Sequence, residues 1–397
     1  MNVFNLALKN IRGNGVRSLI IFLCVMGLAV FFVSTTLIIR GAENSLTRGL
    51  ERMGADILVV PRGAETKIET ALLMGKPTDI WMPRTMLNQV AAVQGVEAVS
   101  PQIYLSSLYG QSCCSVSEMF TVVFDPETDF AIRPWMEQNL RRNLKDGEVI
   151  GGTYIYTPPG DRYIKMYGDN LTLVGNLEPT GTGLDRSMFF TMETARSMAA
   201  GSLTAAAEPL YLPDDQISAV LVKVRPGTDV HKVALQIQLD NAEVVPIESP
   251  NLFGSFRRQM TGLLWGLLVL LSVAWALSAV LIGLLFSMAA NEREREIAIL
   301  RSLGATHFYI FGSLLSEAVI LALTAGVLGI SIAAFVIYSF RDYLAASLRM
   351  PFLFPSFPSF MGLVAIVMVL SLVTVALGSL IPAIRITRKE PALAMRE

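Results

Sequence analysis

The sequence predicts a membrane protein with four transmembrane α-helices and a large α+β extracytoplasmic domain inserted between helices 1 and 2. The chain is 52% hydrophobic and only 16% charged. Its mean hydropathy of +0.51 is too high for an ordinary soluble protein. A span needs about 20 mostly apolar residues, and four segments satisfy this requirement: Leu19–Ile39, Met260–Ala290, Phe308–Phe340 and Ser359–Ile381.

In residues 1–16, apolar side chains recur beside the basic residues Lys9 and Arg12. This pattern predicts a short amphipathic helix at the cytoplasmic membrane surface. A frayed cytoplasmic tail is the alternative. Gly13 and Gly15 interrupt this helix before the first span, residues 17–40. The span is longer than the apolar region of a cleavable signal, and no small-x-small site follows it directly. We therefore expect it to be a retained anchor.

We expect residues 41–257 to form the extracytoplasmic domain. A segment of this length is enough for one or two small domains. Apolar residues recur among charges up to Gly54, so we expect the first span to continue outward as a stalk helix. The apolar spacing of Thr228–Asn241 predicts a second helix, and Leu87–Leu105 predicts a helix, a turn and a strand. The other predicted strands are Asp56–Val60, Phe120–Asp125, Asn170–Leu177, Ser187–Met192 and Ile217–Val224.

The chain returns to the membrane at residues 258–290, 308–340 and 359–381, with an extracytoplasmic loop at 341–358 and a tail at 382–397. Two of these spans carry rows of small residues at every fourth position. Such rows allow helix backbones to approach closely, so we expect helix contacts along them. The rows are Ala279, Gly283 and Ser287 in one span, and Ala325, Gly329 and Ala333 in the next.

Basic residues flank the spans on one side, and by the positive-inside rule that side is cytoplasmic. Four spans then place both termini inside and residues 41–257 outside. Arg341 and Arg349, in the short outer loop, are a mild exception. The flanking basic residues are Lys9, Arg12, Arg17, Arg293, Arg295, Arg301, Arg385, Arg388, Lys389 and Arg396.

Residues 291–307 begin with alternating charges, Glu292 to Glu296, that mark the emergence of a helix into the cytoplasm, because charges are costly in hydrocarbon. Pairs three residues apart support continued helix. Beyond them Ile297, Leu300 and Leu303 share a stripe with Arg301 beside it, and Gly304 ends the helix. This short helix either lies on the membrane surface or docks into a groove on a cytoplasmic partner.

Four stretches resemble the FtsX/MacB-like permeases of ABC transporters. The segment "NEREREIAILRSLGA" is similar to the stretch after the family's second span, with Ala298 and Ser302 as mild departures. "NLALKNIRGNGVRSL" resembles the amphipathic start of the family, and "PAIRITRKEPALAMR" its closing tail. "GADILVV" and "GDNLTLVGNLEPTGTGLDRSMFF" resemble its extracytoplasmic core domain.

The resemblance implies a permease dimer, with itself or a sister permease, bound to two copies of a cytoplasmic ATPase. It also implies that ATP-driven motion passes to the outer domain, a mechanism called mechanotransmission. The ATPase-coupling contact would then be made by Glu296, Ile297, Leu300, Arg301, Leu303 and Gly304. The sequence contains no G-x-x-x-x-G-K-[ST] motif, so we expect no enzyme activity in this chain and ATP-Mg on the partner.

Glu317 is the one charged residue within the four apolar segments Leu19–Ile39, Met260–Ala290, Phe308–Phe340 and Ser359–Ile381. An acid inside a span is costly and by default suggests a function such as proton or ion coupling. A structural reading is nearly as good, because a neighbouring helix can satisfy the side chain by hydrogen bonding. We expect a membrane-embedded acid at this position and leave its role open.

Cys113 and Cys114 are adjacent in the predicted outer domain. Such a pair can form a disulfide, bind a soft metal or exchange with another thiol, and it can also be two reduced cysteines without a role. Met119 and His231 are further candidate ligands, although nothing in the sequence brings them together. No nucleophile motif lies beside His231, which argues against hydrolytic catalysis.

The sequence therefore predicts a permease subunit of an ABC transporter that exports or extracts a substrate, with an adaptor or substrate protein as a further extracytoplasmic partner. One alternative is an FtsX-like signal transducer that regulates a cell-envelope enzyme. The other is a permease that handles metal, haem or thiols through Cys113 and Cys114. We expect a multi-pass protein of the inner membrane and no nucleic-acid partner.

Overall fold

The computed structural model describes residues 3–76, 78–106, 119–157, 160–206, 209–292, 299, 306–346 and 351–388. The chain divides into two compact units, which are described separately. The helical unit comprises Met1–Arg40, Met260–Phe340 and Phe354–Glu397. The sheet unit comprises Gly41–Gln259 and Arg341–Leu353.

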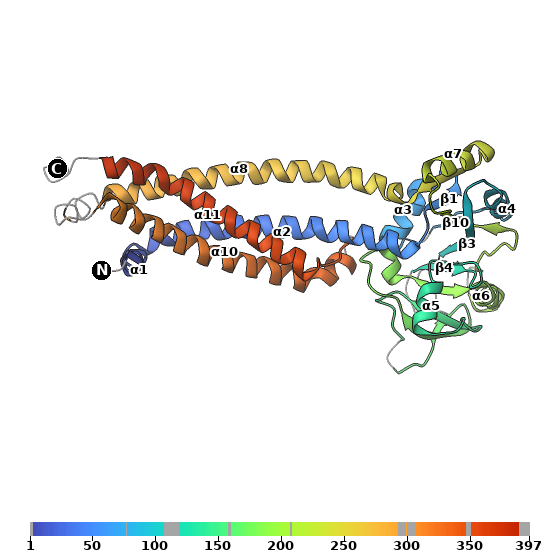
Figure 1. Cartoon of the computed structure of the whole chain (residues 1–397). Coiled ribbons are helices and arrows are strands. Elements are labelled where there is room, and N and C mark those ends of the chain that lie inside the picture. The colour runs from blue at the N-terminus through green and yellow to red at the C-terminus, as the bar shows by residue number, and fades with distance from the viewer. Residues whose placement is uncertain are drawn as a thin grey trace. The chain divides into compact units, whose positions relative to one another are not determined.

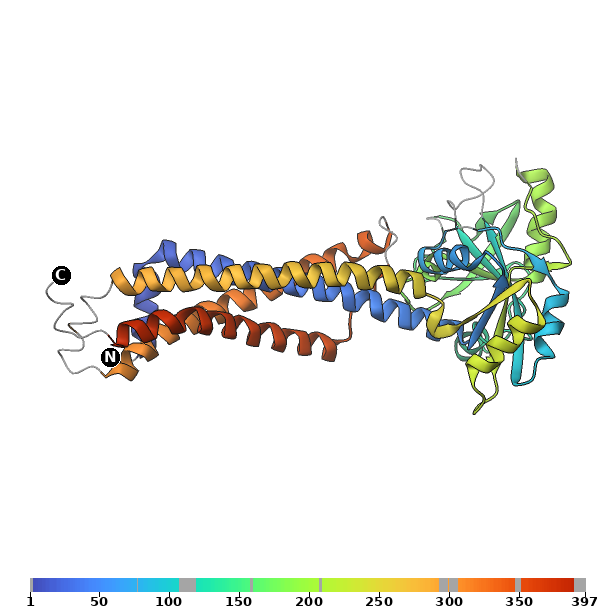
Figure 2. The ribbon, with the colours of Figure 1, turned by 90° about the horizontal axis from the view of Figure 1, so that it is seen from above.

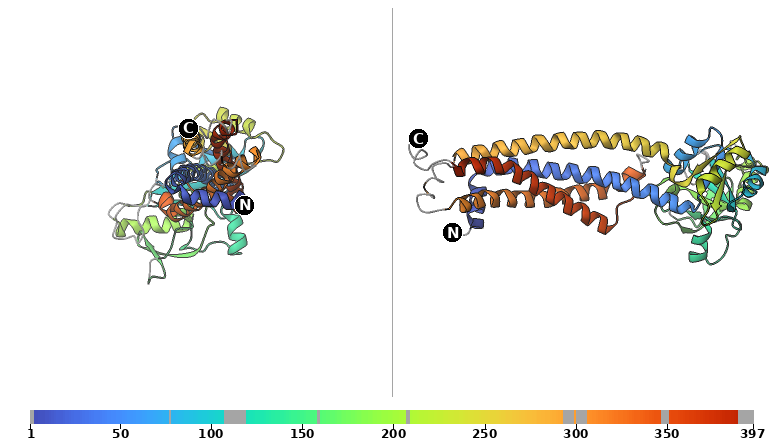
Figure 3. Two further views of the ribbon diagram at one scale, coloured as in Figure 1. Left: turned by 90° about the vertical axis from the view of Figure 1, so that its left-hand side faces the viewer. Right: turned by 45° about the horizontal axis from the view of Figure 1, so that its top comes forward.

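Among the described residues, four helices are long and apolar enough to cross a membrane, as the sequence predicts. They lie side by side in the helical unit (Figures 1 and 3). A short helix, α1, precedes them. The five helices are α1 (Val3–Gly13), α2 (Gly15–Met53), α8 (Gly254–Glu292), α10 (His307–Ala346) and α11 (Phe357–Arg388). The expected stalk is present, because α2 continues without interruption to Met53.

Small residues make the close helix contacts that the sequence predicts. A Cβ atom on Gly329 of α10 would lie 2.8 Å from the carbonyl oxygen of Met26 and 2.9 Å from Cβ of Ala29, both on α2. A Cβ atom on Gly283 of α8 would lie 3.4 Å from the carbonyl oxygen of Gly378 on α11. Both small-residue rows therefore lie where helix backbones approach one another. Within lipid no hydrophobic driving force brings helices together, so the dispersion contacts made at such close approaches stabilise their packing.

The sheet unit is built on a nine-stranded sheet with the order β11-β1-β10-β3-β4-β8-β5-β7-β6. Most neighbouring strands are antiparallel, but β4 is parallel to β8 and β5 is parallel to β7. A separate ladder joins β2 (Met82–Pro83) to β9 (Gln216–Ile217). The strands of the large sheet are β1 (Ile57–Pro61), β3 (Val96–Ser106), β4 (Phe120–Phe124), β5 (Glu148–Gly151), β6 (Ile164–Met166), β7 (Asp169–Asn176), β8 (Met188–Thr191), β10 (Ala219–Val224) and β11 (Val244–Glu248).

Helices cover both faces of this sheet (Figure 2). Alternate residues of the central strands enter two separate apolar cores, as the two-residue period of a strand requires. On β1, for example, Val59 enters one core and Leu58 the other. The first core includes α4 (Thr85–Ala91), α6 (Met192–Ala205) and α7 (Val230–Asp240). The second includes α3 (Glu65–Met74), α5 (Arg133–Asn139) and the last turns of α2.

The predicted mixed α+β fold is confirmed, and each predicted strand is present within a few residues of its expected position. The turn at Gly95 is also present, with φ +97°. The strand β1 extends one residue beyond its predicted end, because Pro61 is its last residue and pairs with Val244 of β11. The sequence analysis did not predict α3, α5, α6, β5, β6 or β11. Their packing against the sheet, rather than a strong local pattern, holds them in place.

We expect Gly329→Val to destabilise the helical unit, because the new side chain would collide with Met26 and Ala29 and separate α10 from α2. The matched control is Gly362→Val on α11, where an added Cβ atom meets no atom within 4 Å. Thermal unfolding in detergent should show a lower midpoint for Gly329→Val and an almost unchanged one for Gly362→Val. Equal midpoints for the two variants would contradict the close contact.

Candidate functional site

Most of the predicted site residues lie outside the described part of the chain. This holds for the ATPase-coupling residues Glu296, Ile297, Leu300, Arg301, Leu303 and Gly304 and for the cysteines Cys113 and Cys114. Glu317 is described and lies on α10. The described residues form two clusters of polar contacts, one around Glu317 in the helical unit and one at the ends of the stalk segments in the sheet unit.

Glu317 is buried in an ion pair with Arg17. The Nη2 atom of Arg17, on α2, donates a hydrogen bond of 3.1 Å to Oε1 of Glu317. The side chain of Glu317 is 1% exposed and that of Arg17 is 11% exposed. An isolated acid in a span is expensive, and a paired cation offsets much of that cost. In the sequence Arg17 is only one of the basic residues that flank the first span. No local pattern links it to Glu317, which is 300 positions away.

Arg17 also faces the end of α8. Its Nη1 atom lies 3.7 Å from Oε2 of Glu292, a longer and more exposed ion pair. Neither Nη1 nor Nε has a hydrogen-bond partner among the described residues, although both atoms are buried. One guanidinium thus faces carboxylates from two other helices, and Glu292 is the last described residue of α8, at the start of the predicted coupling segment, residues 291–307. Movement of that end of α8 would change the electrostatic field at the Arg17 guanidinium.

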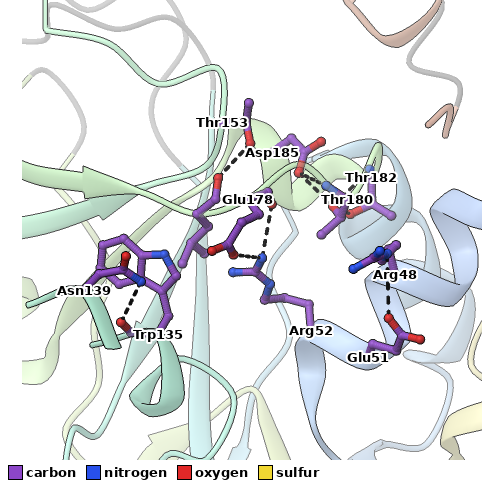
Figure 4. Close-up of polar contacts among 11 residues, drawn as sticks. Arg48, Glu51, Arg52, Trp135, Asn139, Thr153, Glu178, Thr180, Thr182 and Asp185 are labelled. Atoms are coloured by element: carbon purple, nitrogen blue, oxygen red, sulfur yellow. Dashed lines mark hydrogen bonds and ion pairs between the residues drawn. The ribbon is translucent and has the colours of Figure 1, made fainter. Parts of the chain in front are cut away.

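In the sheet unit, a buried carboxylate organises the loop between β7 and β8 (Figure 4). Oδ1 of Asp185 accepts hydrogen bonds from the backbone N–H and the hydroxyl of Thr180, at 2.7 and 2.8 Å. Oδ2 accepts one from the N–H of Gly181 at 2.6 Å. Burial raises the pKa of Asp185, while these hydrogen bonds act in the opposite direction. The loop is therefore held by one side chain.

The stalk segment of α2 packs against this loop. Arg52 donates a hydrogen bond of 2.6 Å to the Glu178 carboxylate and a second, of 3.2 Å, to the Glu178 carbonyl (Figure 4). A Cβ atom on Gly49 would lie 2.9 Å from Cγ2 of Thr182, so the helix and the loop are in close contact. Leu46 and Met53 of the same segment are buried in the apolar core. The end of α2 is thus fixed to the sheet unit by polar and apolar contacts.

The segment that leads to α11 reaches the same place. The N–H of Phe352 donates to the carbonyl of Gly181 at 3.0 Å, and the N–H of Leu353 donates to the carbonyl of Gly41 at 3.0 Å. The ring of Phe352 lies directly against Gly41, where any side chain would collide with it. The chain before α11, the end of α2 and the loop around Asp185 therefore form one cluster within the sheet unit. We call it the joint.

The beginning of α8 is attached through α3. Oε1 of Glu69 accepts a hydrogen bond of 2.8 Å from the N–H of Phe256, in the first turn of α8. The first N–H groups of a helix lack intrahelical partners, and a carboxylate there also complements the helix dipole. Burial raises the pKa of Glu69, whereas the N–H groups of Phe256 and Ser255 and the charge of Arg258 lower it. Phe253, just before the helix, is buried in the same core.

The described residues contain no group of three or more histidine, cysteine, aspartate or glutamate side chains able to hold a metal ion. His231, one of the candidate ligands, instead pairs with Glu248: its Nδ1 lies 2.7 Å from Oε1 of that residue at the surface. This contact raises the pKa of His231. The role of Cys113 and Cys114 remains a sequence-based expectation, because both lie outside the described residues.

The Arg17–Glu317 pair predicts a specific pattern of stability. Glu317→Leu leaves a buried guanidinium without its closest carboxylate, and breaking a buried pair in this way typically costs about 3–5 kcal/mol. Replacing both partners, Arg17→Met with Glu317→Leu, removes the uncompensated charge and should restore much of the loss. Thermal unfolding in detergent measures both effects. A double variant less stable than Glu317→Leu alone would show that the pair does not act as a unit.

Two family models match the chain. The model for the MacB-like periplasmic core domain matches residues 19–239, and the model for the FtsX-like permease C-terminal region matches residues 268–391. No match was found among curated proteins. Together the two models cover both the four-span plan and the inserted domain.

Two solved structures are similar to part of the chain. The periplasmic region of MacB from Actinobacillus actinomycetemcomitans aligns at 8% identity with a TM-score of 0.32, over 52% of this chain and 95% of that chain. The extracellular domain of the noncanonic ABC-type transporter YknZ from Gram-positive bacteria aligns at 12% identity with a TM-score of 0.27, over 49% and 99%. The family models carry the assignment, since the first of them spans more than half of the sequence. The chain belongs to the multi-pass membrane permeases of the MacB/FtsX kind, which are of the ABC-transporter type.

Proposed function

We propose that this permease passes the motion of a separate cytoplasmic ATPase to its extracytoplasmic sheet unit and thereby exports or extracts a substrate. Permeases of this family partner with a cytoplasmic ABC ATPase and are typically not enzymes themselves. The observation that supports the proposal most is the joint, because it fixes the end of α2 to the sheet unit by hydrogen bonds and close packing. A firm attachment transmits helix movement, whereas a loose one would absorb it.

At the other end of the route, the proposal assigns the first step to residues 291–307. Ile297, Leu300 and Leu303 would fill a groove on the ATPase and Arg301 would pair with an acid at its rim. Displacement of this segment would move Glu292, the last residue of α8, and so alter the charges that face Arg17 on α2. Because α2 is a single helix from Gly15 to Met53, movement at Arg17 would reach the joint.

The proposed orientation places both termini in the cytoplasm and the sheet unit outside. It rests on the positive-inside bias of the flanking charges. Two ATPase copies and a second permease, identical or related, would complete the complex. An extracytoplasmic adaptor or substrate protein would be the partner of the sheet unit.

Signal transduction across the membrane is the second candidate function, because the same coupling route would serve to regulate an envelope enzyme. The large sheet unit favours transport, since a transducer needs only a small contact surface outside. Metal or thiol handling would depend on Cys113 and Cys114 and is the third candidate.

Motion of the sheet unit can be measured by spin-label distances. Leu239 on α7 is 70% exposed and accepts a label as Leu239→Cys once Cys24, Cys113 and Cys114 are replaced by serine. We expect the distance between labels in two permease copies to differ between the nucleotide-free complex and one trapped with ATP. An unchanged distance in a complex that hydrolyses ATP would argue against mechanotransmission.

Leu300→Glu is the test variant for coupling in that experiment, and Glu294→Ala is its matched control. Loss of a buried interface anchor typically costs about 2 kcal/mol or more, whereas a rim charge contributes little. Leu300→Glu should therefore abolish both ATPase association and the change in distance, and Glu294→Ala should preserve both. Wild-type coupling in a well-inserted Leu300→Glu variant would instead indicate a helix that rests on the membrane surface.

The orientation has its own test. We expect a membrane-impermeant maleimide, applied to intact cells or spheroplasts after mild reduction, to label Cys113 and Cys114. A variant with both cysteines replaced by serine controls for labelling at Cys24, which lies on α2. Labelling that requires permeabilised membranes would indicate the inverted topology.

A further inference from the structure

A cavity in the sheet unit lies at the carboxyl ends of two parallel strands. It has a volume of about 390 Å³ and is lined by the last residues of β4 and by the residues that follow β8. Since β4 and β8 are parallel neighbours, both strands end at the same edge of the sheet. Ligands of open sheets commonly bind outside the carboxyl ends of parallel strands, where the chain diverges to form a crevice.

Charged side chains form the rim of the cavity, and buried apolar residues lie behind its wall. Ile103, Val123, Phe124 and Leu144 line it and are nearly inaccessible to solvent. The rim carries carboxylates and guanidinium groups together. Its acids are Asp125, Glu127, Asp146 and Glu193, and its bases are Arg84 and Arg196. Four carboxylates and two guanidinium groups leave a formal excess of two negative charges.

Hydrogen bonds hold the walls in place. Asp125 accepts from the N–H of Glu127 and from the hydroxyl of Thr128, both at 3.0 Å, which fixes the turn after β4. The N–H of Gly147 donates to the hydroxyl of Thr194 at 3.1 Å, which ties the loop before β5 to the first turn of α6. A cavity with preformed walls loses less freedom when a ligand binds.

We propose that this cavity binds a short peptide with free ends. The peptide's carboxylate would lie against Arg84 and Arg196, and its ammonium against the carboxylates of the rim. Arg196 also pairs with Asp214 at 3.3 Å, but a guanidinium has five N–H donors and can serve two carboxylates. The excess of negative charge favours a peptide with an additional basic side chain.

A solvent-filled cleft with ordinary surface charges is the competing interpretation, and it predicts no saturable binding. The proposal does not depend on ATPase coupling, because it concerns binding alone. It can therefore hold or fail separately from mechanotransmission.

Calorimetry on the full-length permease in lipid nanodiscs tests the proposal. The probe is the tripeptide Ala-Lys-Ala with free ends, compared with its N-acetylated and its C-amidated forms. We expect saturable binding of the free peptide and about tenfold or weaker binding of each blocked form, because each block removes a charge-assisted contact. No saturable binding up to millimolar peptide, or equal binding of all three forms, would overturn the proposal.

Amide substitutions locate the binding. Arg196→Gln and Asp146→Asn should each weaken binding of the free peptide about tenfold. Asp161→Asn, at an exposed acid that does not line the cavity, should leave it unchanged. Unfolding temperatures confirm that each variant is folded, and Glu193→Gln replaces any that is not. Wild-type affinity in the folded rim variants would place the peptide elsewhere and contradict the assignment.

Discussion

The attachment of the sheet unit to its stalk depends on the hydrogen bonds that the carboxylate of Asp185 accepts. It accepts three hydrogen bonds from Thr180 and Gly181 and so gives the loop after β7 a single conformation. That conformation presents Glu178 to Arg52 and the carbonyl of Gly181 to the N–H of Phe352. It also brings Gly183 against Gly75 at the end of α3, so closely that neither position accommodates a side chain facing the other. One buried acid therefore organises contacts with three parts of the chain that are distant in sequence. Burial raises the pKa of Asp185, which shows that the fold accepts an electrostatic cost in order to retain this geometry.

The helical unit also contains a buried carboxylate, that of Glu317. Glu317 is buried among the helices, so its carboxylate needs a partner within the protein, and Arg17 provides it from α2. A buried ion pair of this kind contributes little net stability, because desolvation offsets most of the attraction. Its value lies in specificity, since it favours the arrangement of α2 and α10 in which the two charges meet. The small residues act in the same direction. Gly329 permits α10 to approach Met26 and Ala29 on α2, so the glycine contact and the ion pair join the same two helices.

Much of the fold could be predicted from the sequence, because it depends on local patterns. Hydropathy predicted the four spans, and short runs of apolar and β-branched side chains predicted the strands β1, β3, β4, β7, β8 and β10. The small-residue rows predicted helix contacts that the structure confirms. The candidate site was less accessible. Arg17 and Glu317 are 300 residues apart, and Glu69 and Phe256 are 187 apart, so no local pattern connects them. The expected coupling residues from Glu296 to Gly304 stay a prediction. The short elements β5, β6 and β11 were missed because their residues take strand conformation only against neighbours already in the sheet.

The strand order has a consequence for how the protein is made. β1 lies between β10 and β11, and Val59 pairs with Val220 on one side and with Pro246 on the other. Both partners are synthesised much later, on the order of ten seconds or more at the usual rates of translation. Throughout that time the apolar segment Ile57–Pro61 has neither of its neighbours, and unpaired strands of this composition aggregate readily. The first span will already have anchored the chain while the sheet is still incomplete. The strand β1 therefore remains unpaired until the residues just before the second span have emerged.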